Sequence, residues 1–73
     1  MTNDDLERAL RAFARRQPFR HFFIEFHSGE HILITHPEAV DRFGGLFLYR
    51  AANRGQRVFS GDGVSQLIDP PPT

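Results

Sequence analysis

The pattern of apolar and polar positions divides the chain into one helical segment followed by five short segments of strand character. The helical segment has apolar residues at three- and four-residue spacing, namely Leu6, Ala9, Leu10 and Phe13. This spacing predicts a helix over residues 3–16, with Thr2 or Asn3 as its N-cap and its end set by Pro18. One amphipathic helix of this length is unstable alone, so we expect it to dock on the rest of the chain.

From residue 20 onward the apolar positions alternate with polar ones, and glycine, asparagine and proline mark the turns. The predicted strands cover residues 20–27, 30–36, 45–50, 56–60 and 64–68. Pro37 ends the second strand, and residues 37–45 form a connector. Residues 1–69 thus make a single domain, and residues 70–73 are a proline-rich tail.

One helix ahead of five short strands has few compact arrangements. Five strands are too few for two full sheets, so a bent sheet that curls into a small barrel, with the helix over one opening, is favoured. The predicted fold class is therefore mainly β with one N-terminal α-helix, as a five-stranded SH3-like or Sm-like barrel. The OB-fold fits less well because its helix lies within the strand order.

Composition narrows the classes of protein. A chain of 73 residues has a small core, and the absence of cysteine excludes disulfides and cysteine-based zinc sites. No apolar run approaches the ~20 residues of a membrane span, and no signal peptide precedes the helix. We expect a cytoplasmic protein without a membrane partner, supported by self-association.

Charge is zero in sum but uneven along the chain. All nine cations are arginine, and they concentrate in residues 8–20 and 50–57, where no acid occurs. Arginine suits phosphate because its guanidinium donates two parallel hydrogen bonds. Ordinary solvated charge explains each zone equally well.

The sequence gives little support for a catalytic site or a metal site. His21 and His36 would face each other if Ser28 and Gly29 made a two-residue hairpin loop, and Glu25 or Glu38 could complete a zinc site. Strand histidines are more often ordinary half-buried residues. No serine has a nucleophile-elbow setting, so we predict no enzyme, no cofactor and no metal.

Several residues carry a resemblance to a known family. Phe22, Ile24 and Phe26 alternate into Gly29, Asp41-Arg42-Phe43 follows the second strand, and Phe59-Ser60-Gly61-Asp62-Gly63-Val64 comes before the last. In this order the chain resembles the Sm-like and Hfq-like small barrel proteins. It departs from them at Ser60, where the family usually has a basic residue.

The resemblance implies a ring of identical subunits that binds single-stranded RNA. It implies joining of the fourth strand of one subunit to the fifth strand of the next. It assigns the nucleotide pocket to Asp41, Arg42 and Phe43, completed by Gly61 and Asp62, with Arg15 and Arg16 as phosphate contacts at the rim.

One alternative function remains open, and the chain carries one further resemblance. The same fold could serve as a protein-interaction or structural module that binds no nucleic acid, in which case exposed aromatics and strand edges contact a partner chain. Under either function, Phe23 is expected to pack on another subunit, and Phe43 either to stack on a base or to pack on another subunit. The chain also resembles a set of small bacterial proteins through Gln17-Pro18-Phe19-Arg20 and His36-Pro37-Glu38, a resemblance that implies no activity.

Overall fold

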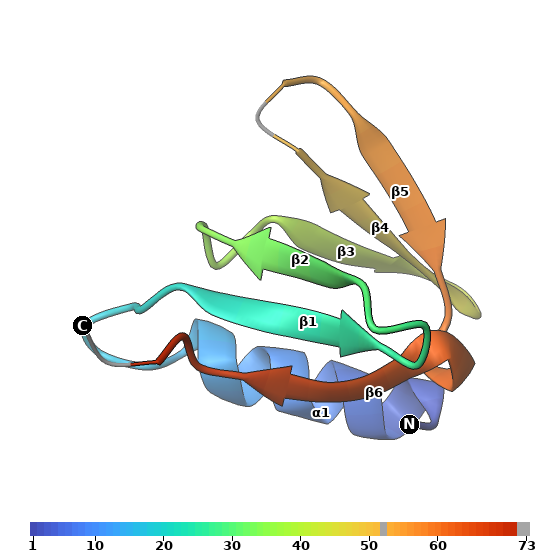
Figure 1. Cartoon of the computed structure of the whole chain (residues 1–73), viewed down its shortest axis with the longest axis horizontal. Helices are drawn as coiled ribbons and strands as arrows, with labels where there is room; N and C mark the ends of the chain where they lie inside the picture. Colours follow the sequence, from blue (N-terminus) through green and yellow to red (C-terminus); the bar gives the residue numbers. More distant parts are fainter. Residues whose placement is uncertain (52, 72–73) are drawn as a thin grey trace.

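The computed structural model describes residues 1–51 and 53–71, and within them one helix precedes all the strands (Figure 1). Helix α1 covers Asn3–Ala14. It begins at Thr2, whose hydroxyl accepts a hydrogen bond from the amide of Asp5 at 3.0 Å and so satisfies one free donor of the first turn. The helix ends two residues earlier than predicted. The predicted tail extends to residues 72–73, which lie outside the described residues.

The first sheet has the order β2-β1-β6 and is antiparallel throughout. Its strands are β1 (Phe22–Phe26), β2 (His31–Ile34) and β6 (Val64–Ile68). Alternate residues of β1 and β2 are buried, as the period-two pattern predicts. The bounds of β6 agree with the prediction, and β1 and β2 are shorter than predicted.

The second sheet has the order β3-β4-β5. Its strands are β3 (Val40–Phe43), β4 (Leu46–Arg50) and β5 (Gln56–Phe59). Strand β3 corrects the prediction, because it lies within residues 37–45, which were expected to form a connector. The described residues therefore contain six strands rather than five. Gly44, at a φ of 59°, closes a two-residue hairpin between β3 and β4 and fixes their pairing.

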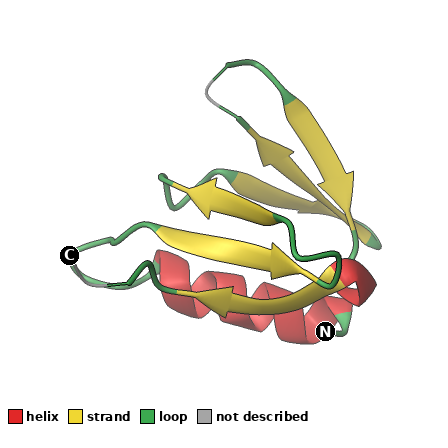
Figure 2. Cartoon of the chain, viewed as in Figure 1, coloured by secondary structure: helices red, strands yellow, loops and turns green. Residues whose placement is uncertain are grey.

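The two sheets face each other but do not close into the predicted five-stranded barrel. The chain passes between them at residues 35–39, and again at the short 3-10 helix η1 (Gly61–Gly63) between β5 and β6. Figures 1 and 2 show the β4–β5 hairpin diverging from the first sheet, with α1 lying along β6 on the opposite side of the molecule.

A single apolar core joins the helix and both sheets. Leu6 from α1 is fully buried against the inner faces of the sheets. Phe59 lies between Phe26 of the first sheet and Phe47 of the second, at ring-centroid distances of 5.3 Å and 5.8 Å. No polar residue is buried within the described part of the chain. In the same part, no helix is long and apolar enough to cross a membrane.

Candidate interaction surface

The outer face of the second sheet carries an unusual share of exposed apolar side chains. Because residues alternate between the faces of a strand, Phe43 of β3, Leu46 and Leu48 of β4 and Val58 of β5 share this face. Phe43 and Val58 are each 59% exposed and Leu46 is 49% exposed. We call these four residues the apolar face.

Polar contacts on the same side of the sheet lie beside the apolar face. Asp41 and Arg50 form an ion pair between β3 and β4. The pair satisfies its own charges, so the apolar face has no unpaired charge within it. Large exposed apolar side chains gathered on one face are typical of surfaces that contact another molecule.

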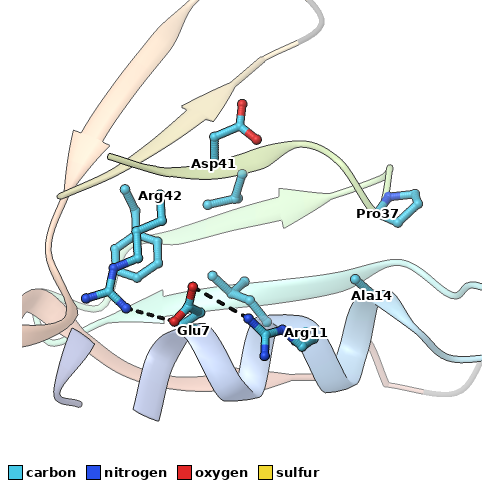
Figure 3. A pocket seen from close by; sticks show the side chains of 9 residues that line it. Glu7, Arg11, Ala14, Pro37, Asp41 and Arg42 are labelled. Carbon is cyan, nitrogen blue, oxygen red and sulfur yellow. Dashed lines mark hydrogen bonds and ion pairs between the residues drawn. The ribbon is translucent and has the colours of Figure 1, made fainter. Parts of the chain in front are cut away.

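The strand alternation separates the predicted nucleotide-pocket residues. Asp41 and Phe43 point outward, whereas Arg42 points inward to α1 (Figure 3). The guanidinium of Arg42 pairs with Glu7 at 2.9 Å and with Asp4 at 3.3 Å, and it also donates to the carbonyl oxygen of Gly44. Arg42 therefore fastens the second sheet to the helix, and two carboxylates already neutralise its charge.

Gly61 and Asp62 lie at the start of α1. A side chain on Gly61 would collide with the backbone of Thr2, whose atoms lie 2.7 Å from the position of a Cβ. The backbone N–H of Gly61 donates a hydrogen bond to the side-chain oxygen of Asn3 at 2.7 Å. The side-chain nitrogen of Asn3 in turn donates to the backbone carbonyl of Gly45 at 2.9 Å. Asn3 thus connects η1 to the β3–β4 turn, a role that its sequence position next to the N-cap did not reveal. Asp62 is exposed.

The predicted phosphate contacts lie at the other end of α1. Twelve helical residues separate the two ends by about 18 Å. The side chain of Arg16 is 19% exposed, pairs with Asp69 at 2.7 Å and lies over the ring of Phe13 at 4.6 Å. Arg16 is thus a structural residue at the edge of the first sheet, while Arg15 is exposed and has no ion pair among the described residues.

The second basic zone is also largely neutralised. Arg50 pairs with Asp41, and Arg57 pairs with Glu30 while its guanidinium lies over the ring of Phe26 at 4.2 Å. In the described part of the chain, Arg54 alone in this zone lacks an ion pair. Most of the arginines in these two zones that the structure describes are therefore partnered by acids of the same chain.

A cleft of about 240 Å³ separates α1 from β3, and Figure 3 shows its lining. Its floor is apolar, and Glu7 lies at its rim between Arg11 and Arg42, at 3.7 Å and 2.9 Å. Because these charges pair with each other, the cleft offers no free group to orient a ligand. A shallower groove of about 420 Å³ lies between β2 and the β4–β5 hairpin, and the Arg57–Glu30 pair crosses it.

The two histidines considered as a zinc pair, His21 and His36, do not lie opposite each other. Phe22 lies opposite Ile34 and Glu25 opposite His31, so His21 and His36 are one residue out of register. The reason is the hairpin loop, which has three residues rather than two and ends at Gly29 with a φ of 91°. Within the described residues no group of three or more potential metal ligands occurs.

The outer face of the first sheet is polar at its centre. Glu25 accepts one hydrogen bond from the side-chain amide of Gln66 at 2.9 Å. Its other carboxylate oxygen lies 3.0 Å from Nε2 of His31. The hydrogen bond from Gln66, together with the neighbouring His31, holds the pKa of Glu25 below its ordinary value. The exposed groups of this face thus satisfy one another across the strands.

Comparison of the chain with family models, with curated proteins and with solved structures finds no match. Its function is therefore inferred from its own geometry.

Proposed function

We propose that this chain is a non-catalytic protein-interaction module that binds another polypeptide through the apolar face of its second sheet. The observation that carries the proposal is the gathering of Phe43, Leu46 and Val58 on one side of three adjacent strands, each about half-exposed or more. Cores of protein interfaces are apolar and enriched in aromatic residues, whereas charged residues are depleted there. The apolar face has this composition.

The architecture supports a relationship to the SH3-like and Sm-like small barrels. The helix precedes the strands, and the two sheets continue into each other at residues 35–39 and at η1. Both features agree with a bent sheet that curls on itself with a helix beside it. Binding modules of this size act by presenting a surface, which agrees with the pairing of most charged groups inside this chain.

Site-specific photo-cross-linking tests the proposal. A photoreactive phenylalanine analogue replaces Phe43 in one variant and Leu33 in the other, which is 40% exposed on the first sheet. In the cells that produce the protein, we expect the analogue at position 43 to join a defined polypeptide and the analogue at position 33 to do so far less. Equal yields at the two positions, or adducts with RNA alone at position 43, would contradict the proposal.

Single-stranded RNA binding is the second candidate, and the exposure of Phe43 is the observation that favours it. Phe43 adjoins the β3–β4 turn, which Asn3 connects to Gly61, so these two parts of the predicted pocket lie near each other. An exposed ring can stack on a base for about 1–3 kcal/mol. The nearby Asp4 and Asp5, however, place negative charge at this end of the helix.

Fluorescence anisotropy with labelled U-rich and A-rich oligonucleotides at low salt separates the two candidates. RNA binding through Phe43 predicts an affinity that is lost in Phe43→Ser and retained in Leu33→Ser. The protein-interaction proposal predicts no binding by either variant or by the original chain at micromolar protein.

Assembly into a ring also remains a proposal. It needs β5 of one copy to pair with β6 of the next, and both are edge strands of their sheets. Light scattering tests it directly, since a closed head-to-tail ring has a fixed number of subunits and a mass that is independent of dilution over a wide range.

A further inference from the structure

We infer that a second copy of this chain joins the edge of the second sheet, antiparallel through the β5 strands of both copies. This inference goes beyond the proposed function, because edge pairing leaves the apolar face open and extends it across both copies. The result is one sheet of six strands, in which Val58 of each copy lies at the two-fold axis.

The first step is to find which backbone groups of β5 are free. The amide of Ala51 donates to the carbonyl of Gly55, which makes these two residues a hydrogen-bonded pair beside the β4–β5 turn. Hydrogen-bonded and non-hydrogen-bonded pairs alternate along an antiparallel ladder. Arg57 and Phe59 therefore bond to β4, while the N–H and C=O groups of Gln56 and Val58 point away from it.

The free edge of β5 has few of the features that prevent an edge strand from pairing with another chain. The strand contains no proline and no lysine, and the side chain of Arg57 points inward to Glu30 and Phe26. Val58 is 59% exposed. An edge with free backbone groups and an apolar side chain is a template for another strand.

Charge selects the register. If Gln56 lay opposite Val58 of the second copy, the Arg57 side chains of the two copies would face each other directly, and like charges in that position are destabilising. If Val58 lies opposite Val58 of the second copy, each Arg57 lies opposite the buried Phe59 instead, so the two cations no longer face each other. With Val58 opposite Val58, the backbone N–H and C=O groups of the two valines also bond to each other.

This register also joins the two apolar faces. Leu48 of β4 lies opposite Val58 of β5. Phe43 and Leu46 lie opposite each other beside the β3–β4 turn. A two-fold axis at Val58 places the Leu48–Val58 pairs of both copies side by side and continues the apolar face from one copy to the other. Self-complementarity of this kind is what a two-fold interface requires.

Of the other edge strands, β6, which a head-to-tail ring would use, is less available. Strand β6 packs against α1, and the carbonyl of Val64 at its start already accepts a hydrogen bond from the amino group of Met1 at 2.9 Å. Among the hydrogen bonds of the described residues outside the helices and strands, none goes to the backbone of Gln56 or Val58. Pairing of β5 with β5 is therefore favoured over the head-to-tail pairing of β5 with β6.

A cysteine at position 58 tests the inference. The chain has no cysteine of its own, so Val58→Cys introduces a single thiol. A hydrogen-bonded antiparallel pair has Cα atoms about 5.5 Å apart, which a disulfide can span. Under mild oxidation we expect the disulfide-linked dimer of Val58→Cys to form roughly tenfold faster than that of the matched control Leu33→Cys, because the dimer raises the local thiol concentration.

Sedimentation equilibrium gives the second readout, and it needs no cysteine. The unmodified chain should double its mass as its concentration rises. Val58→Pro should keep the mass of one chain, since a proline at this position removes only an N–H that does not bond to β4. The circular dichroism spectrum of Val58→Pro reports whether it is folded, and Val58→Cys decides the question if it is not.

Three outcomes overturn the inference. They are equal oxidation rates for Val58→Cys and Leu33→Cys, a single-chain mass at every concentration, and a mass well above two chains. A single-chain mass combined with a cross-link from position 43 to a different polypeptide would leave the proposed function standing and remove only the second copy. If position 43 forms no polypeptide cross-link either, the proposed function fails as well.

Discussion

The outer faces of the two sheets differ in how their side chains are partnered. On the first sheet, Glu25 is held by Gln66 and His31 from the strands on either side of it. On the second sheet, Phe43, Leu46 and Val58 are exposed, and the helix α1 lies along β6 of the first sheet (Figure 2). The polar centre of the first face is partnered within one chain, whereas the second buries its apolar area only if another molecule covers it. This difference is the reason for proposing the interaction surface on the second sheet.

The largest effect is expected from the inner face of the second sheet. Phe47→Ala should lower the free energy of unfolding by about 3–5 kcal/mol, because Phe47 is fully buried and its loss leaves a cavity. Phe43→Ala, on the outer face of the same sheet, should change it by less than about 0.5 kcal/mol. Urea unfolding followed by circular dichroism measures both. Similar losses for the two variants would contradict the assignment of the faces.

A smaller effect is expected where the two sheets meet at η1. Gly61→Ala should cost about 1–3 kcal/mol, because the added methyl group meets the backbone of Thr2 and Asn3 and must displace the start of α1. Gly63→Ala is the matched control within the same short helix, since the nearest atom to its Cβ is an ordinary contact at 3.9 Å. Thermal unfolding of the two variants should differ clearly, and equal midpoints would show that η1 does not hold the helix in place.

The two neighbouring arginines at the end of α1 should also differ. Arg16→Met should lower the free energy of unfolding by about 1 kcal/mol, because it removes a charged hydrogen bond to Asp69 beside the first sheet. Arg15→Met should leave stability within about 0.5 kcal/mol, since Arg15 is exposed. Chemical denaturation tests the pair, and a larger loss for Arg15→Met would mean that the roles are reversed.

The smallest effect concerns the polar centre of the first sheet. Because the pKa of Glu25 is lowered in the folded chain, this carboxylate contributes stability above its ordinary unfolded pKa, and the contribution is lost as pH falls through the lower folded pKa. Gln66→Met removes the main cause and should raise the pKa of Glu25 towards its ordinary value. An NMR titration of the Glu25 carboxyl measures it. An unchanged pKa would show that Gln66 does not set it, and Ser65→Ala serves as the control.

Local pattern predicted the elements better than it predicted their pairing. The strand at residues 64–68 and the N-terminal helix could be anticipated because turn residues and apolar spacing agree there. Strand β3 was missed because Asp41 and Arg42 interrupt its apolar alternation. The one-residue error in the β1–β2 register came from a loop whose length depends on the positive φ of Gly29, which the residue type permits but does not require.

The candidate site could be predicted only in part. Phe43 was identified as an aromatic residue free to contact a partner, and its exposure agrees with that expectation. The structure places Phe43 and Arg42 on opposite faces of β3, because strand alternation directs Arg42 to the acids of α1. The connection of Gly61 to Gly45 through Asn3 joins residues that are far apart in the sequence, so no local pattern could reveal it.

Amide hydrogen exchange at two protein concentrations is the most direct test that the second sheet, and not the first, is completed by another chain. Leu33 is a matched reference for Val58, because the amides of both residues point away from the neighbouring strand of their own sheet. We predict that the amide of Val58 exchanges more slowly as concentration rises while that of Leu33 does not change. Exchange at Val58 that is independent of concentration, or protection at Leu33 instead, would contradict the account.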